Sequence, residues 1–242
     1  MRAVVTRPRE DAEAVARELS RRGLEVMVEP LLDIVPVDGA VADAIGAQGI
    51  LVTSANGIRA LARLLPDRSL PVWAVGDASA RVARELGYRT VESAGGDVDD
   101  LARLVRSRCD PARGALLHAA GTAVAGDLAG WLAGDGFEVR RLVLYQAVTA
   151  ERLTPELAAE LAAGSIDLAL FFSPRTAATF ARLVRAAGLA DALSRVAAYG
   201  LSANVARELA DLPWRCVRTA AEPTQAALLA ALDEDLERET LR

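Results

Sequence analysis

The chain has 242 residues, and 28 basic residues against 33 acidic ones give a formal net charge of −5. Its 52% hydrophobic residues can fill the cores of two domains, while only 4% aromatic residues offer no stacking platform for bases, so we expect no nucleic acid partner. Every basic residue is an arginine, which excludes Schiff-base, pyridoxal phosphate and P-loop chemistry because each depends on a lysine.

The histidine and cysteine content predicts a protein without a metal or cofactor. His118 is the only histidine, and Cys109 and Cys216 are far apart in the chain, so they cannot form a histidine/cysteine zinc site. Two unpaired thiols are typical of a reducing compartment. The chain opens without a leader pattern, and its apolar runs are too short to span a membrane, so we expect a cytoplasmic protein with no membrane partner.

Short apolar runs alternate with amphipathic helical stretches along the chain. The first run, 3–6, is followed by a helical pattern over 11–22 that ends at Gly23. Strands separated by helices require right-handed crossovers and therefore predict an α/β fold with parallel sheets. Further strands are expected near 49–53, 72–75, 89–92, 115–118, 168–172, 196–199 and 215–218.

The same order of motifs occurs twice. The first copy contains Ile50–Asn56, Val72–Gly76 and Ser79–Leu86, and the second contains Leu168–Pro174, Val196–Gly200 and Ser202–Leu209. A duplicated sequence of this kind predicts two similar lobes, and a cleft between them is the first place to look for function.

Two long segments interrupt the alternation. Leu24–Val37 and Phe137–Val148 are apolar and extended, and each is about twice as long as an ordinary strand of ~5–6 residues. Each is expected to begin in one lobe and enter the other, so that strands at about 30–37 and 140–148 form a two-stranded hinge. The lobes would then be 1–35 with 149–242, and 38–145. The alternative is two sequential domains divided near Pro111.

Small, hydroxyl-bearing or amide-bearing residues follow most of the predicted strands. In parallel sheets, ligands bind beyond the carboxyl ends of the strands, where helix N-termini offer N–H groups to anions. The same residue types also cap helices and form turns, so capping alone is the alternative for each of them, and for His118 a structural hydrogen bond. The candidate binding residues are Arg7, Ser54, Ala55, Asn56, Gly76, Ser79, His118, Gly121, Thr122, Ser173, Pro174, Arg175, Thr176, Gly200, Ser202 and Thr224.

Tyr145 is the candidate catalytic residue. It lies in the second predicted hinge strand, where its phenol would face the cleft and could donate or position a proton. The alternative role of this side chain is packing within the hinge.

Six short motifs, taken in order, resemble the uroporphyrinogen-III synthase family over essentially the whole chain. They are Thr6-Arg7-Pro8, Thr53–Asn56, Val75-Gly76 with Ser79-Ala80, Tyr145, Phe171–Pro174, and Tyr199–Ala203. The chain departs from the family pattern at 119–122, which lacks arginines, and at 201–202, where Leu-Ser replaces Pro-Thr-Thr.

The resemblance implies two flavodoxin-like lobes joined by a β-ladder, and a cyclising lyase of haem biosynthesis. It implies that hydroxymethylbilane, a linear tetrapyrrole octacarboxylate, closes to uroporphyrinogen III with inversion of ring D and loss of water. This substrate ionises itself to a reactive azafulvene, so preorganised N–H donors and proximity could suffice without a cofactor. We therefore expect a monomer that acts on this small molecule, with Tyr145 as its catalytic side chain.

Two other functions stay open at this point. A two-lobed binding or regulatory protein of the same fold, without turnover, is favoured by the departures at 119–122 and 201–202. A sugar- or nucleotide-binding enzyme is disfavoured because no Gly-x-Gly-x-x-Gly motif follows a strand.

Overall fold

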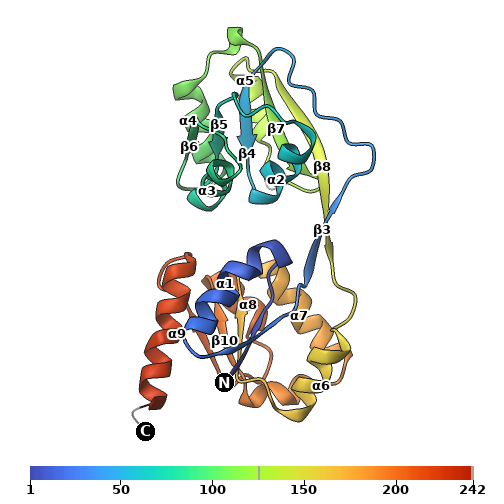
Figure 1. Cartoon of the computed structure of the whole chain (residues 1–242), viewed down its shortest axis with the longest axis vertical. Coiled ribbons are helices and arrows are strands. Elements are labelled where there is room, and N and C mark those ends of the chain that lie inside the picture. The colour runs from blue at the N-terminus through green and yellow to red at the C-terminus, as the bar shows by residue number, and fades with distance from the viewer. Residues whose placement is uncertain (125, 241–242) are drawn as a thin grey trace. The chain divides into compact units, whose positions relative to one another are not determined.

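The structure of the protein is a computed structural model that describes residues 1–124 and 126–240. The chain forms two compact units: unit 1 contains Met1–Asp33 and Val148–Arg242, and unit 2 contains Ile34–Ala147. Each unit has its own sheet, with helices packed on both faces (Figure 1). The prediction of an α/β protein built on parallel sheets is therefore confirmed.

Unit 1 contains a five-stranded sheet in the order β11-β10-β9-β1-β2, and all of its pairings are parallel. Numbered within the unit, this is the order 2-1-3-4-5 of flavodoxin-like folds. The strands are β1 (Arg2–Val5), β2 (Glu25–Val28), β9 (Leu168–Phe171), β10 (Ala197–Gly200) and β11 (Cys216–Thr219). The helices are α1 (Arg9–Arg21), α6 (Pro155–Ala163), α7 (Pro174–Ala186), η2 (Ala190–Arg195), α8 (Ala203–Leu209) and α9 (Gln225–Thr240).

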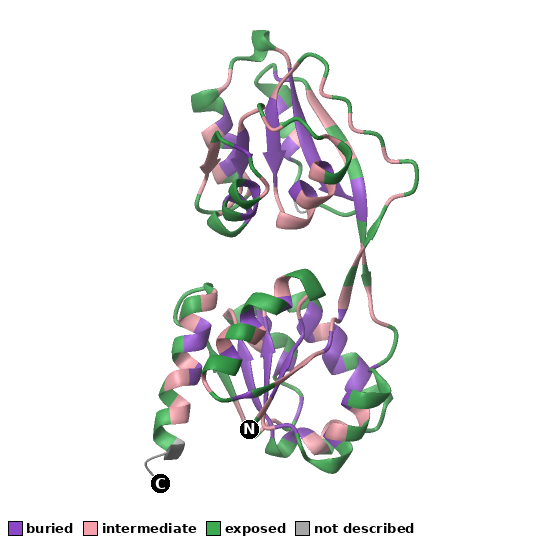
Figure 2. Ribbon diagram, in the orientation of Figure 1, coloured by how far each residue is buried: buried purple, intermediate pink, exposed green. Residues whose placement is uncertain are grey.

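The buried residues of unit 1 form a core on each face of this sheet (Figure 2). Successive strand residues point to opposite faces, so Ala3 and Val5 pack with α1 and α9, whereas Val4 packs with α6 to α8. The second face includes three aromatic rings, with centroids 5.1 Å apart for Phe171–Phe180 and 5.8 Å for Phe171–Trp214. These contacts hold α7 and the segment after α8 against the sheet, on the face opposite α1.

Unit 2 contains a six-stranded sheet in the order β3-β8-β7-β4-β5-β6. Numbered from β4, its parallel strands have the order 3-2-1-4-5, and β3 is added at the outer side of β8. The strands are β3 (Leu32–Pro36), β4 (Ala47–Val52), β5 (Val72–Ala74), β6 (Val91–Ser93), β7 (Ala115–Gly121) and β8 (Val139–Thr149). The helices are α2 (Ala55–Leu64), α3 (Asp77–Glu85), α4 (Val98–Arg108), η1 (Pro111–Arg113) and α5 (Leu128–Gly134).

The chain passes from unit 1 to unit 2 through β3 and returns through β8, and these two strands are neighbours. The N–H of Val37 donates to Leu144 O at 3.1 Å, and the N–H of Ala150 donates to Leu31 O at 3.1 Å. The first extended segment contains two strands, β2 and β3, separated by residues 29–31. The N–H of Glu29 still donates to Val5 O at 2.9 Å, and the next residue, Pro30, has no N–H to continue the ladder.

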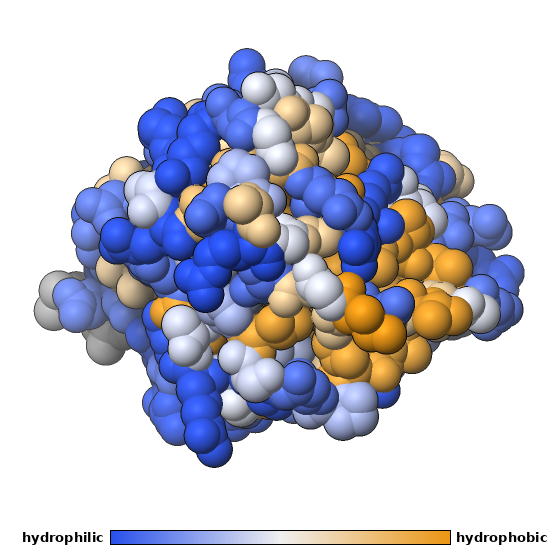
Figure 3. All heavy atoms as spheres, turned by 90° about the horizontal axis from the view of Figure 1, so that it is seen from above, coloured by the Kyte–Doolittle hydropathy of each residue, from blue (hydrophilic) through white to orange (hydrophobic). Residues whose placement is uncertain are grey.

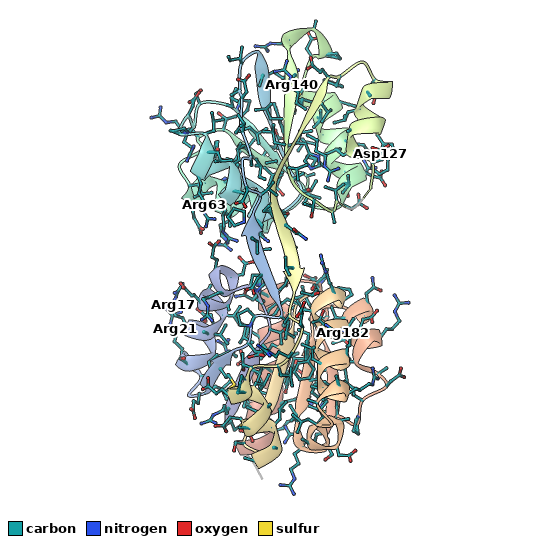
Figure 4. All side chains as sticks on the ribbon, turned by 90° about the vertical axis from the view of Figure 1, so that its right-hand side faces the viewer. Arg17, Arg21, Arg63, Asp127, Arg140 and Arg182 are labelled. Carbon is teal, nitrogen blue, oxygen red and sulfur yellow. The ribbon has the colours of Figure 1, made fainter. Side chains whose placement is uncertain are left out.

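Much of the surface on the face seen in Figure 3 is hydrophilic, with apolar side chains gathered in one area. Charged side chains such as Arg17 and Arg21 of α1 extend into solvent (Figure 4). Within the described part of the chain, no helix has the length and apolar character needed to cross a membrane.

Candidate functional site

The sheet of unit 1 brings four predicted loops to one edge. Strands β1, β9, β10 and β11 are consecutive parallel neighbours, so their carboxyl ends lie side by side, and a helix begins after each of them. The predicted residues at this edge are Arg7 after β1, Ser173, Pro174, Arg175 and Thr176 after β9, Gly200 and Ser202 at the end of β10, and Thr224 after β11. We call this the carboxyl edge of unit 1.

The hydroxyl groups at this edge cap helices. Ser173 Oγ accepts the N–H of Thr176 at 3.2 Å, and Thr224 Oγ1 accepts the N–H of Ala227 at 3.2 Å. Ser202 is the N-cap residue of α8, where its Oγ accepts from Val205. Pro174 occupies the first turn of α7, where the missing N–H costs nothing. The helix N-termini still carry partial positive charge, which favours anions at this edge.

Arg7 is held by side chains from three other segments of unit 1. Its Cζ lies 4.6 Å from the centre of the Phe172 ring, and its Nη1 donates to Gln225 Oε1 at 3.2 Å. Its Nη2 lies 3.8 Å from Asp11 Oδ2. Arg175, the other predicted charge partner, is exposed in the first turn of α7. Both predicted arginines thus follow the strand ends at which carboxylates were expected to bind.

The sheet of unit 2 brings together a second set of predicted residues. β4 lies between β5 and β7, and all three run parallel. Gly57 of α2 allows a close approach, because a Cβ there would lie 2.2 Å from Ala119 O of β7. The first turn of α2 is thereby placed against β7. The predicted residues at this carboxyl edge of unit 2 are Ser54, Ala55 and Asn56 after β4, Gly76 and Ser79 after β5, and Gly121 and Thr122 at the end of β7.

Polar contacts at this second edge are mostly local. Ser54 Oγ accepts the N–H of Asn56 at 3.2 Å, and Asn56 Oδ1 accepts from Arg59 Nη1 at 3.2 Å. Gly76 is the N-cap residue of α3, without a side chain to cap it, and Ser79 is buried two residues inside that helix. As in unit 1, the sequence-predicted hydroxyl Ser54 has a capping role, and the groups that face outward from the helix start are backbone N–H groups.

The predicted position of His118 at a strand end is wrong. β7 continues to Gly121, so His118 lies in the middle of the strand and is 3% exposed. Its Nε2 lies 3.2 Å from Thr53 Oγ1. Burial, together with the nearby positive charge of Arg141, lowers the pKa of His118 to about 4. A neutral buried imidazole does not attract carboxylates, so this position favours the structural role.

Tyr145 lies in β8 and packs into the core of unit 2. It is 8% exposed, and its register partner across the sheet is Gly121. The N–H of Thr122 donates to Tyr145 O at 2.9 Å, which fixes the loop after β7 to the backbone of β8. The ring is therefore beside the predicted Gly121-Thr122 loop, although its burial favours packing as one of its roles.

Four residues that contribute to these edges were missed at the sequence level. Arg141 Nη2 donates to Gly121 O at 2.8 Å and to Thr122 O at 2.9 Å, and so supports the loop after β7. Phe172 and Gln225 contact Arg7, as described above. Glu29, 2% exposed, accepts from Thr154 N at 2.8 Å and from Thr154 Oγ1 at 2.7 Å. A charged residue directly after an apolar strand and before Pro30 was the available signal for Glu29.

A hollow of about 310 Å³ lies between α2 and α3, and none of the predicted residues lines it. It is lined by Arg59, Ala62, Arg63, Arg68, Val82, Glu85 and Leu86. Among the described residues, no group of three or more histidine, cysteine, aspartate or glutamate side chains is arranged to hold a metal ion.

Comparison with known proteins agrees with the fold and the motifs. Residues 13–230 match the family described as HEM4: Uroporphyrinogen-III synthase HemD. A protein from Chlorobaculum parvum named uroporphyrinogen-III synthase is 28% identical over 229 residues, which cover 85% of this chain and 87% of that protein.

Two solved structures share the fold at low sequence identity. Uroporphyrinogen-III synthetase from Helicobacter pylori aligns with a TM-score of 0.62 and 16% identity over 98% of this chain and all (100%) of that one. A mutant uroporphyrinogen III synthase from Thermus thermophilus aligns with a TM-score of 0.54 and 19% identity over 98% of this chain and 99% of that one. On the family match, which spans most of its length, this chain belongs to the uroporphyrinogen-III synthase family.

Proposed function

We propose that this chain is a uroporphyrinogen-III synthase, a lyase of haem biosynthesis. It cyclises hydroxymethylbilane to uroporphyrinogen III, with inversion of ring D and loss of water. The observation that carries the proposal is the family match over residues 13–230. The two carboxyl edges support it, since helix N-termini following adjacent parallel strands suit a substrate with eight carboxylates.

The substrate carboxylates are bound mostly by backbone N–H groups. The segments are Ser54–Asn56, Gly76–Ser79, Gly121-Thr122, Ser173–Thr176, Gly200–Ser202 and Thr224, with Arg7 and Arg175 as charge partners. The capping bonds of Ser54 and Ser173 engage these hydroxyl groups, together with the N–H groups of Asn56 and Thr176, within the protein, so other backbone N–H groups of the two segments bind the substrate. Replacing either serine by alanine is then expected to cost a cap, about 1 kcal/mol of stability, with little loss of turnover.

For the reaction, the protein must hold the linear substrate in a folded conformation and bind its negatively charged carboxylates. The hydroxymethyl C–O bond breaks as the pyrrole nitrogen loses its proton, which gives the azafulvene and, once the hydroxyl is protonated, water. Tyr145 donates a hydrogen bond or proton to that hydroxyl. Backbone donors hold the carboxylates so that the two ends of the linear tetrapyrrole approach each other. Ring closure with inversion of ring D follows from this proximity.

The proposal extends to the state and setting of the protein. It acts as a monomer in the cytoplasm, and strands near 30–37 and 140–148 serve as the hinge of lobes 1–35 with 149–242 and 38–145. The free thiols of Cys109 and Cys216 support a reducing compartment. Light scattering coupled to gel filtration measures the molar mass in solution and so tests the proposed monomer.

The decisive experiment follows product isomers. The purified protein is incubated with hydroxymethylbilane, the products are oxidised, and the type I and type III uroporphyrins are separated. Excess type III isomer, made in proportion to protein concentration, is the expected result. If only the type I isomer forms, at the rate of the reaction without protein, the chain is a binding or regulatory member of the family and the proposal is rejected.

A further inference from the structure

The loop after β7 differs from the helix starts at the carboxyl edge of unit 2, because the N–H group of its first exposed residue is already used. This residue is Thr122, whose N–H donates to Tyr145 O at 2.9 Å. The loop also has the carbonyl groups of Gly121 and Thr122. Carbonyl oxygens are hydrogen-bond acceptors and carry partial negative charge, so by themselves they would repel a carboxylate.

Arg141 of β8 covers both carbonyl groups. Its Nη2 donates to Gly121 O at 2.8 Å and to Thr122 O at 2.9 Å. Both acceptors are uncharged, so these bonds hold the guanidinium in place without neutralising it. Across residues 1–124 and 126–240, no acidic side chain forms an ion pair with Arg141, and Arg141 is itself exposed. A positive charge is therefore held at this loop and is accessible to a ligand.

The imidazole next to Arg141 does not oppose this charge. Arg141 and His118 are register partners in β8 and β7, so their side chains lie on the same face of the sheet. Burial and the positive charge of Arg141 together lower the pKa of His118 to about 4, so the ring is neutral near pH 7. Its Nε2 lies 3.2 Å from the uncharged Thr53 Oγ1. The neighbours of the guanidinium on β7 are thus neutral groups.

The preceding residue of β8 is an arginine whose charge is compensated. Arg140, labelled in Figure 4, has its Nε 2.7 Å from Glu138 Oε1, and its Nη1 donates to Ile45 O at 2.8 Å. Because successive strand residues point to opposite faces, Arg140 and Arg141 lie on opposite faces of the sheet. Arg140 therefore has the same residue type at the adjacent position, but with its charge paired.

We propose that Arg141 is a substrate-binding residue whose guanidinium receives a carboxylate of the linear tetrapyrrole at the loop after β7. Both N–H groups of Nη2 are directed to the loop, and those of Nε and Nη1 are the donors for the ligand. This inference rests on the proposed function and deepens it, because at this segment the guanidinium takes the place of the N–H of Thr122.

The test measures kcat and KM for hydroxymethylbilane, the Kd for uroporphyrin III by fluorescence, and Tm. Arg141→Gln removes the charge but keeps an amide that can donate to the loop carbonyls. KM and Kd are expected to rise about tenfold, the low end for a hydrogen bond to a charged group because the site is exposed. The change in kcat should stay within about twofold, since the contact is made equally before and during the reaction.

Arg141→Lys separates a charge that binds substrate from a merely structural tie. It keeps the positive charge and should leave KM and Kd within about threefold of the parent. If Arg141 only ties the loop to β8, the glutamine and lysine variants should have similar effects, seen mainly as a lower Tm. If it binds a carboxylate, the effect of Arg141→Gln on Kd should shrink between about 0.05 M and about 0.5 M NaCl, because salt screens exposed charges.

Arg140→Gln is the matched control. It makes the same change in net charge one position away, but it removes a cation that is paired with Glu138, so KM and Kd should stay within about twofold of the parent. The imidazole resonance of His118 checks where the guanidinium lies. Arg141→Gln should raise the pKa of His118 in the folded protein, because it removes the nearby positive charge, and Arg140→Gln should leave it unchanged.

The proposal is overturned if Arg141→Gln leaves KM and Kd within twofold of the parent, or if Arg140→Gln weakens binding equally. An unchanged pKa of His118 in Arg141→Gln would place the guanidinium elsewhere and would also overturn it. A parent protein that makes no type III isomer rejects the proposed function instead. The Kd values for uroporphyrin III then still decide whether Arg141 binds a carboxylated tetrapyrrole.

Discussion

Gly121 and Tyr145 contact each other across neighbouring strands, and the contact leaves no room for a side chain at position 121. A Cβ built there would lie 2.9 Å from both Cε2 and Cζ of the Tyr145 ring. Position 121 therefore needs a glycine, because the ring of its register partner Tyr145 fills the space that a side chain would occupy. The same contact places the ring at the end of β7.

Gly121→Ala should displace the Tyr145 ring and destabilise unit 2. Overpacking of a tight core contact costs about 1–3 kcal/mol, which urea unfolding monitored by circular dichroism can measure. Gly134→Ala is the matched control, since a Cβ there has no neighbour within 4 Å. Equal stabilities of the two variants would mean that the ring moves aside without cost.

Tyr145→Phe removes only the phenolic oxygen and tests its role in the reaction. If the hydroxyl protonates or steadies the leaving group, kcat falls, by about 10²-fold at most, and the share of spontaneous type I isomer rises. Tyr88→Phe removes a phenolic oxygen from the same hydrophobic core and should leave the isomer ratio unchanged. A Tyr145→Phe variant with the parent's rate and ratio would assign Tyr145 to packing alone.

His118 should make stability fall as pH is lowered from about 6.5 to about 4. Its pKa is about 4 in the folded protein and about 6.5 when unfolded, so the unfolded chain binds more protons within this window. The contribution lost across the window is about 3 kcal/mol, with no further slope from this residue outside it.

The measurement for His118 compares urea midpoints of the parent and of His118→Asn from pH 4 to pH 8. The difference between the two curves should shrink as pH falls. Since His118 is the only histidine, its imidazole resonance also reports the folded pKa directly. A resonance that titrates near pH 6.5 in the folded protein would contradict the prediction.

Glu29→Ala should destabilise unit 1, because Thr154 N and Oγ1 would both lose their buried acceptor. Leaving such donors unpaired costs about 1–3 kcal/mol. Glu25 begins β2, the strand that ends just before Glu29, and is 67% exposed in its ion pair with Arg2, so Glu25→Ala should change stability by less than about 1 kcal/mol. Similar losses from the two variants, measured by urea unfolding, would argue against a specific role for the Glu29–Thr154 contact.

The sequence was sufficient to predict the α/β architecture because each strand and helix has a local signal. The apolar run at 3–6 and the capping Gly23 place β1 and α1 within one or two residues of their observed bounds. The strand through His118 was underestimated, because Ala119, Ala120 and Gly121 have low strand propensity and are held by pairing with β8.

Side-chain contacts between distant segments could not be predicted in the same way. Arg7 and Gln225 are 218 positions apart, and Glu29 and Thr154 are 125 apart. Such pairs depend on which strands become neighbours, and the sequence pattern does not specify strand order. The positions of the hydroxyl residues after the strands could be predicted. Whether each of them caps a helix or binds a ligand could not, because both roles have the same sequence signal.

The placement of β1 between β2 and β9 has a consequence for synthesis on the ribosome. The first two strands emerge early, yet their sheet lacks β9 until residue 171 has been translated. Residues 34–147, in contrast, emerge as one uninterrupted segment that already contains all the parallel strands of its sheet. The middle of the chain can therefore fold first, while the N-terminal β1-α1-β2 unit keeps apolar surface uncovered until β9 has been made.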